Sequence, residues 1–167
     1  MKTQFSTFRK AILFLALAFA ALPAFSQSNI LVGAWRLTAA DKILTDGSQV
    51  ADYGTAPRGM AIFTADGHYM IEIFQSAGRI KFASGDRAKG TPEEYKNAVL
   101  SASCHFGTYN VDAEKGTITF HVDRASYPNW DESTRVSKFT IEGDKLTWRT
   151  PPRPDGSVPV SIFSRIR

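Results

Sequence analysis

Short runs in which apolar and polar residues alternate make up most of the chain after residue 32. In residues 117–123, for example, Ile118, Phe120 and Val122 alternate with polar side chains. Successive side chains of a β-strand point to opposite faces, so this period of two predicts a strand with one buried face. The same criterion predicts strands at residues 32–39, 59–65, 68–75, 104–111, 117–123, 136–141, 145–150 and 160–166.

Turn-forming residues separate these runs. Asp66-Gly67 predicts a two-residue hairpin turn between two of the strands. The polar segment 41–58 and the long loop 76–90 each have room for one more short strand, the latter at residues 81–83. Residues 151–159 are rich in proline and predict a loop before the last strand.

One helix interrupts the predicted strands. The Thr-Pro-Glu-Glu sequence at residues 91–94 is a capping box with proline at the first helical position, and apolar residues follow at helical spacing to about Ser103. Cys104 is the single cysteine, so an internal disulfide is excluded. We expect it to be a small buried side chain of this amphipathic segment rather than a nucleophile.

Regularly spaced short strands are typical of an antiparallel barrel or sandwich. We predict an all-β fold, an antiparallel up-and-down β-barrel of about eight strands with one short helix. A barrel of this size either fills its interior with side chains or holds one small ligand. The chain has 12 Phe, 5 Tyr and 3 Trp, which predicts an aromatic lining suited to a flat, apolar or weakly polar molecule.

The first 26 residues have the layout of a secretory signal peptide. Basic residues at positions 2, 9 and 10 precede an apolar run at 11–22, and small residues follow at positions 24 and 26. The run is shorter than the roughly 20 apolar residues of a membrane-spanning helix, although an uncleaved anchor is the alternative. We therefore expect cleavage after Ser26, a single domain over residues 27–167, and a periplasmic or secreted protein.

Removal of this leader changes the charge of the protein. The full chain has 20 Lys and Arg against 16 Asp and Glu, and the leader contains three of the basic residues and no acidic one. The remaining 17 against 16 leave a net charge near +1, with both signs interspersed along the sequence. We therefore expect no nucleic-acid partner and no stable membrane anchor after cleavage, while the oligomeric state stays open.

Gly33-Ala34-Trp35 on the first predicted strand resembles the G-x-W signature of lipocalins. That resemblance implies a tryptophan that closes the base of the barrel and packs against a basic residue of the last strand. Arg165 and Arg167 are both candidates for this partner.

Further segments are similar to a family of bacterial and fungal lipocalin-like domains. These segments are Tyr-Gly-Thr-Ala-Pro-Arg-Gly at 53–59, residues 62–67 and 106–112, His121-Val122, Pro128-Asn129-Trp130, Arg135, and residues 143–146. The chain departs from the family pattern at residues 131–133, Asp-Glu-Ser, where a glycine is expected after the tryptophan. The family is mostly without assigned biochemistry, so the resemblance implies a barrel and leaves the function open.

Several side chains are candidates for binding a ligand. Arg58 could meet a carboxylate in bidentate fashion, and Trp130 could cap the mouth of the barrel. Arg135 could neutralise an acidic ligand, or it could pair with Asp131 at the end of a strand. The predicted ligand-binding residues are Tyr53, Arg58, Tyr69, Tyr109, His121, Trp130 and Arg135.

A catalytic site built on histidine is the alternative. His121 and Asp123 lie two apart in one strand and so point the same way, and His105 lies in the neighbouring strand. A histidine suits acid–base chemistry near neutral pH, but His121 could equally form a structural hydrogen bond at the barrel surface. The few His and Cys residues are not clustered, so we expect no metal site, and the absence of a phosphate-binding or nucleophile motif predicts no cofactor.

The sequence thus predicts an exported barrel that binds or sequesters a small, largely apolar or aromatic molecule. The alternative is a cofactor-independent isomerase, cyclase or hydrolase with His121 or His105 as acid–base and Tyr109 or Arg135 stabilising developing charge. A filled barrel that binds another protein is a third possibility. The direction of the histidine side chains distinguishes these functions: convergence in a cavity favours an enzyme, and exposure to solvent favours binding.

Overall fold

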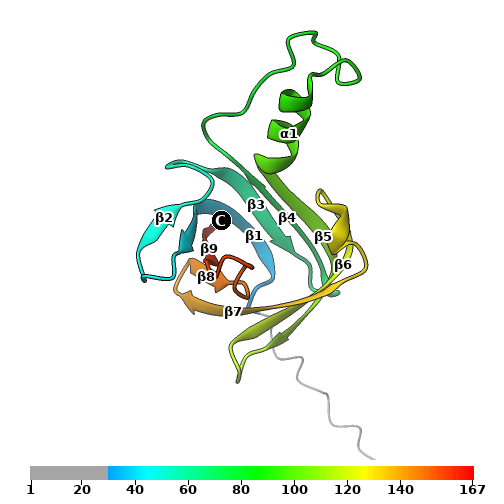
Figure 1. Cartoon of the computed structure of the whole chain (residues 1–167). Coiled ribbons are helices and arrows are strands. Elements are labelled where there is room, and N and C mark those ends of the chain that lie inside the picture. The colour runs from blue at the N-terminus through cyan, green and yellow to red at the C-terminus, as the bar shows by residue number, and fades with distance from the viewer. Residues whose placement is uncertain (1–29) are drawn as a thin grey trace, which may run out of the picture.

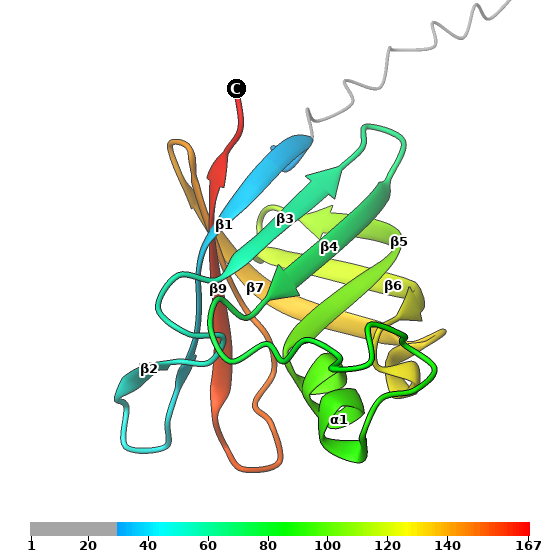
Figure 2. The same cartoon turned by 90° about the horizontal axis from the view of Figure 1, so that it is seen from above.

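Antiparallel strands follow one another around a closed sheet in the computed structural model, which describes residues 30–167 (Figures 1 and 2). The last strand pairs with the first, which closes the ring and confirms the predicted up-and-down barrel of eight strands. The strands are β1 (Gly33–Ile43), β2 (Gln49–Ala51), β3 (Arg58–Phe63), β4 (His68–Phe74), β5 (Ala102–Asp112), β6 (Thr117–Ala125), β7 (Thr134–Glu142), β8 (Lys145–Arg149) and β9 (Val158–Arg165).

The short strand β2 lies outside the closed ring, because it pairs only with the end of β1. It is the additional strand predicted within residues 41–58. Residues 81–83 form no strand and belong to the loop before the helix. The predicted signal peptide, residues 1–26, lies outside the described residues.

Within residues 30–167, no helix combines the length and the apolar character needed to cross a membrane.

The hairpin between β3 and β4 differs from the predicted two-residue turn. The Thr64 and His68 backbones still pair at 2.9 Å, and the Gly67 amide donates to the Thr64 carbonyl at 3.2 Å. The loop therefore has three residues, and Gly67 closes it with a φ of 88°. A type I turn followed by a left-handed residue is the usual geometry of such a loop, so Asp66-Gly67 forms its second half.

The predicted capping box begins helix α1 (Pro92–Leu100). The Glu94 amide donates to the Thr91 hydroxyl at 3.2 Å, and the Glu94 carboxylate accepts the Thr91 amide at 2.7 Å. The same carboxylate accepts the Ala83 amide at 2.7 Å and so ties the preceding loop to the helix; these hydrogen bonds lower the pKa of Glu94. The helix projects from the barrel beside its open end (Figures 1 and 2).

The helix ends three residues earlier than Ser103, and Cys104 does not belong to it. From Ala102 onward the backbone pairs with β4, so the β-ladder replaces the helical hydrogen bonds. Cys104 is a half-buried residue of β5, where burial raises the pKa of its thiol. A thiol with a raised pKa is a poor nucleophile at neutral pH, which agrees with the expectation that Cys104 is structural.

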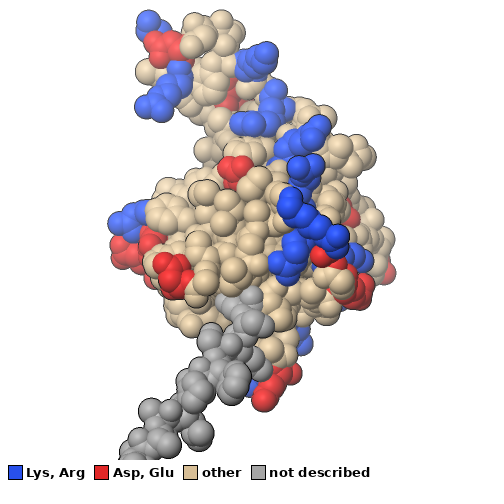
Figure 3. Space-filling view, turned by 180° about the vertical axis from the view of Figure 1, so that it is seen from behind, with Lys and Arg blue, Asp and Glu red and all other residues tan. Residues whose placement is uncertain are grey.

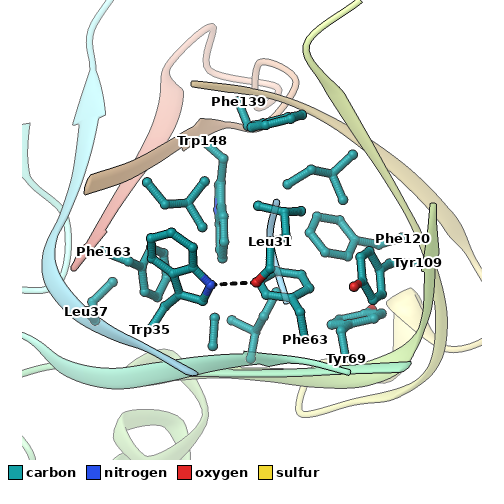
Figure 4. Close-up of a cluster of buried hydrophobic side chains, with 14 of the residues drawn as sticks. Leu31, Trp35, Leu37, Phe63, Tyr69, Tyr109, Phe120, Phe139, Trp148 and Phe163 are labelled. Carbon is teal, nitrogen blue, oxygen red and sulfur yellow. Dashed lines mark hydrogen bonds between the residues drawn. The ribbon is translucent and has the colours of Figure 1, made fainter. Parts of the chain in front are cut away.

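Large apolar side chains fill one end of the barrel (Figure 4). The fully buried Trp35 donates its indole N–H to the Leu31 carbonyl at 2.7 Å, which holds the segment before β1 across this end. Aromatic rings from other strands pack beside it. The packed set includes Leu31, Trp35, Leu37, Phe63, Tyr69, Tyr109, Phe120, Phe139, Leu146, Trp148 and Phe163.

Arg165 is the basic partner of Trp35, as one of the two candidates predicted. Its guanidinium lies 4.0 Å from the centre of the Trp35 ring and donates to the Val32 and Ile30 carbonyls at 2.9 and 2.8 Å. Arg167 is exposed and pairs with Asp144 instead. The closed end is therefore sealed by packing and by three hydrogen bonds to the segment before β1.

Charge on the outer surface is less evenly mixed than the sequence suggests. The face opposite to that of Figure 1 carries a band of Lys and Arg side chains along one side, with Asp and Glu in smaller groups beside it (Figure 3). This band lies on the outside of the molecule.

Candidate ligand-binding site

The other end of the barrel encloses a cavity of about 470 Å³. It exists because the inward side chains become smaller toward this end. On β7, Phe139 lies in the packed half, and Ser137, two residues earlier in the chain, lies beside the cavity. On β9, Phe163 and Ser161 are arranged in the same way. A volume of this order matches the pockets in which proteins hold small ligands.

Aromatic rings line much of the cavity wall. Phe120 and Trp148 form the boundary with the packed half, where their ring centres are 6.1 Å apart. Tyr53, from the loop after β2, and Trp130, from the 3-10 helix η1 (Pro128–Trp130), lie nearer the mouth. Flat apolar surface on several sides favours a ligand with a flat apolar body.

His105 on β5 faces the cavity between these rings. Its Nδ1 is hydrogen-bonded to the Tyr69 hydroxyl on β4 at 2.9 Å, and its ring packs edge-on against Phe120 and Trp130 at 5.9 and 6.0 Å. Burial, and then the positive charge of Arg135, lowers the pKa of His105 to about 4. Burial also raises the pKa of Tyr69. Both side chains are therefore neutral at pH 7.

Arg135 on β7 lies over the ring of Trp130. Its guanidinium is 3.9 Å from the centre of the indole ring, a cation–π contact. The Trp130 carbonyl accepts the Ser133 hydroxyl at 2.6 Å, which ties the backbone of η1 to the residues that follow it. Burial lowers the pKa of Arg135, which nevertheless stays charged at neutral pH.

An ion-pair network forms part of the mouth. The Asp52 carboxylate receives two hydrogen bonds from the Arg153 guanidinium, at 2.6 and 3.2 Å, and lies 3.4 Å from the Lys42 ammonium. The pair connects the loop after β2 to the proline-rich loop before β9. Its fork geometry holds both loops at a fixed place on the rim.

The predicted site residues fall into two groups. Tyr53, His105, Trp130 and Arg135 line the cavity. Tyr69 lies behind the wall and holds His105 through its hydroxyl.

The remaining predicted residues lie away from the cavity. Arg58 is exposed at the start of β3. Tyr109 belongs to the packed half and donates its hydroxyl to the Thr64 carbonyl at 3.0 Å. His121 lies on the outer face of β6, where it contacts Asn110 and Thr134 at 3.3 Å.

The two histidines therefore do not converge. On β6, Ile118 and Phe120 point into the barrel, so His121 between neighbouring apolar positions must point outward. Asp131 does not pair with Arg135 either; it accepts the Ala125 amide at 2.8 Å and lies 3.9 Å from Arg124.

Sequence reasoning missed the Asp52–Arg153 pair and the small residues that leave space for the cavity. Arg153 lies among four prolines in the stretch 151–159, a signal for a rigid loop but not for its partner 101 residues away. Within residues 30–167, no group of three or more His, Cys, Asp or Glu side chains could hold a metal ion.

Comparison with known proteins finds a matching sequence family and similar solved structures. The sequence model of a family described as lipocalin-like domain matches residues 32–162. Among solved structures, a lipocalin-like protein from Bacteroides uniformis ATCC 8492 is 15% identical with a TM-score of 0.43, over 81% of this chain and 98% of that one. A point mutant of the fluorescent protein UnaG is 14% identical with a TM-score of 0.37, over 80% of this chain and 94% of that one. No curated protein sequence matches this chain.

Proposed function

Since the chain belongs to the family of lipocalin-like domains, we propose that it binds one small, largely apolar or aromatic molecule in the open half of its barrel. The observation that carries this proposal is the cavity of about 470 Å³ above a packed aromatic floor. A concave site with a largely apolar wall and a few convergent polar groups is the usual form of a small-molecule site.

The arrangement favours binding over catalysis. Of the predicted catalytic candidates, His121 lies on the outer face and Tyr109 in the packed half, so only His105 and Arg135 line the cavity. His105 remains in the cavity, with a pKa of about 4 that makes it a weak base. We therefore retain the enzyme only as the alternative.

A neutral fluorescent probe tests the binding function. N-phenyl-1-naphthylamine should become brightly fluorescent at one site per chain. Ser137→Phe, which fills the cavity from β7, should abolish this signal, while Thr140→Phe on the exposed face of the same strand should preserve it. Absence of probe binding to the wild-type protein, or unchanged binding by Ser137→Phe, would reject the proposed site.

We also propose that the domain works outside the cytoplasm after loss of residues 1–26. The basic start, the apolar run and the small residues at positions 24 and 26 support this location. Mass measurement of the mature protein from its own host should give a chain that begins at Gln27. A chain that retains the leader would contradict the proposal.

A further inference from the structure

Arg135 faces the cavity without an ion-pair partner among the described residues. We infer that the ligand is an anion whose carboxylate binds between Arg135 and His105. This inference rests on the proposed function, and it adds the chemical class of the ligand. The molecule it describes has a flat apolar body, which packs on the aromatic wall, and one carboxylate at the end that meets β5 and β7.

The first argument is the charge within the cavity. Asp52 is neutralised by Arg153 and Lys42 at the rim. Asp41, on the β1 side of the cavity, has no ion-pair partner among the described residues, and its carboxylate accepts a hydrogen bond from the neutral Gln49 side-chain amide at 2.6 Å. Among the described residues, none forms an ion pair with Arg135. A half-buried cation without a counter-ion is costly, and an anionic ligand would supply the missing charge.

The second argument is the orientation of Arg135. The guanidinium carbon of Arg135 lies over the Trp130 ring, 3.9 Å from its centre. The N–H donors of a guanidinium lie in its plane, and stacking on a ring leaves that edge available. A carboxylate accepts two parallel hydrogen bonds from such an edge, whereas a neutral amide offers one acceptor oxygen.

The third argument is the protonation of His105. Tyr69 and His105 Nδ1 are hydrogen-bonded at 2.9 Å, and we assign the phenol hydroxyl, which burial keeps protonated by raising its pKa, as the donor. The neutral imidazole then carries its proton on Nε2, the ring nitrogen left for the cavity that His105 lines. Arg135 and His105 together thus offer an anion one charged fork and one neutral N–H donor.

The packing of these groups indicates a prepared site. His105 and Arg135 both contact Trp130: the His105 and Trp130 ring centres are 6.0 Å apart, and the Arg135 guanidinium carbon lies 3.9 Å from the centre of the indole ring. Tyr127 also packs edge-on with Trp130, with the ring centres 5.6 Å apart. Because each donor is held by a neighbour, little side-chain freedom remains to be lost when the anion binds.

A matched pair of ligands tests the inference. 2-Naphthoate and 2-naphthamide have the same apolar body and differ in the charge of one group. By calorimetric titration at pH 7 we expect the naphthoate to bind the wild-type protein at least about tenfold more tightly, as charge-assisted hydrogen bonds are about twice as strong as neutral ones. Equal affinities for the two ligands would overturn the inference without recourse to any variant.

Two variants test whether Arg135 is responsible for the preference for naphthoate over naphthamide. Arg135→Gln should remove the preference for naphthoate and leave the affinity for naphthamide within about twofold. Arg58→Gln, which removes an exposed arginine outside the cavity, should leave both affinities unchanged. A naphthoate preference that survives Arg135→Gln would overturn the assignment.

A spectroscopic readout separates a direct role from a structural one. Bound naphthoate places a negative charge beside His105, so the pKa of this imidazole, followed by NMR, should rise on binding, and naphthamide should leave it unchanged. An unchanged pKa with bound naphthoate would overturn the inference.

The failures of the two proposals are distinguishable. If N-phenyl-1-naphthylamine and both naphthalene ligands fail to bind, the proposed function fails and this inference with it. If the neutral probe and naphthamide bind as tightly as naphthoate, the cavity binds ligands and only the anionic class is wrong.

Discussion

His105 should make the free energy of unfolding of this protein fall at acidic pH, and His105→Gln should remove this part of the pH dependence. The unfolded chain protonates this imidazole near its ordinary pKa of 6.5, whereas the folded protein protonates it only near pH 4. Between these values the unfolded state binds more protons than the folded state. The contribution of His105 to the free energy of unfolding is therefore fully present above pH 6.5 and is lost as the pH falls toward the pKa of the folded state.

The magnitude follows from the difference of about 2.5 pKa units, at about 1.4 kcal/mol for each unit. At pH 4 the folded imidazole is half protonated, so the loss relative to pH 7 is about 3 kcal/mol. This is a large share of the roughly 5–15 kcal/mol typical of a whole domain. The cause is burial beside Phe120 and Trp130 with a positive neighbour in Arg135.

The assay is urea unfolding at pH 7, 6, 5 and 4, followed by tryptophan fluorescence, for the wild-type protein and His105→Gln. The variant should be less stable at pH 7 by about 1 kcal/mol, because it loses the hydrogen bond to Tyr69. Its free energy of unfolding should then fall by about 3 kcal/mol less than that of the wild-type protein down to pH 4. Carboxylates contribute equally to both proteins and cancel in the difference.

His121→Gln is the matched control, because it removes an exposed imidazole on the outer face of β6. Its difference from the wild-type protein should stay constant across the pH range. The reasoning is refuted if the wild-type protein and His105→Gln lose the same stability between pH 7 and pH 4.

Three further substitutions test the fold, each by urea unfolding at pH 7. Arg165→Lys removes the aromatic stack and two backbone hydrogen bonds and should cost about 2 kcal/mol, while Arg167→Lys should stay within about 0.5 kcal/mol; equal effects would contradict the proposed seal of the closed end. Gly107→Ala brings a Cβ to 2.0 Å from a carbonyl of β6 and should cost at least about 3 kcal/mol, whereas Gly47→Ala has open space and should cost about 1 kcal/mol for its positive φ. Glu132→Gly should be more stable than Glu132→Ala by about 1 kcal/mol, since residue 132 has a φ of 58°; the reverse order would show that this conformation is not retained.

The barrel was predictable because most of its strands are amphipathic with a period of two, interrupted by register shifts between Leu37 and Ala39 and between Phe106 and Gly107. The same alternation also determines which side chains enter the interior. Ile118 and Phe120 mark the inner face of β6, so an outward His121 follows from the pattern alone. On β5 the buried Tyr109 likewise predicts an inward His105 four residues earlier. The alternation of apolar positions thus already predicts that the two histidines point to opposite faces of the sheet, against the hypothesis that they converge.

The contacts that give the site its chemistry were not predictable in this way. The bond between Tyr69 and His105 depends on the pairing of β4 with β5, in which Ile71 is opposite His105. A shift of that register by one residue would turn one side chain to the outer face. The Asp52–Arg153 pair requires two loops to meet at the rim, and no local pattern encodes such a meeting.

The loop after Trp130 shows how a departure from a family pattern can leave the geometry intact. Where a glycine is expected, Glu132 adopts the left-handed conformation that glycine tolerates without cost. Its carboxylate accepts a hydrogen bond from Arg124 at 3.0 Å, between two largely exposed side chains, which is a small compensation at most. The loop keeps its shape because Ser133 and Asp131 bind the backbone of η1 and β6.

The two halves of the barrel divide stability from recognition. At the closed end, Trp35 and its neighbours bury large apolar surface, which stabilises the fold whatever the mouth contains. At the open end, Arg135 is a cation held in place by Trp130 without a carboxylate partner among the described residues, an arrangement that does not stabilise the empty protein. A group that weakens the empty fold but is fixed in one orientation is expected where a ligand completes it. The apolar packing of the closed end stabilises the fold whether or not the cavity holds a ligand. The protein can therefore keep an unpaired Arg135 at the open end.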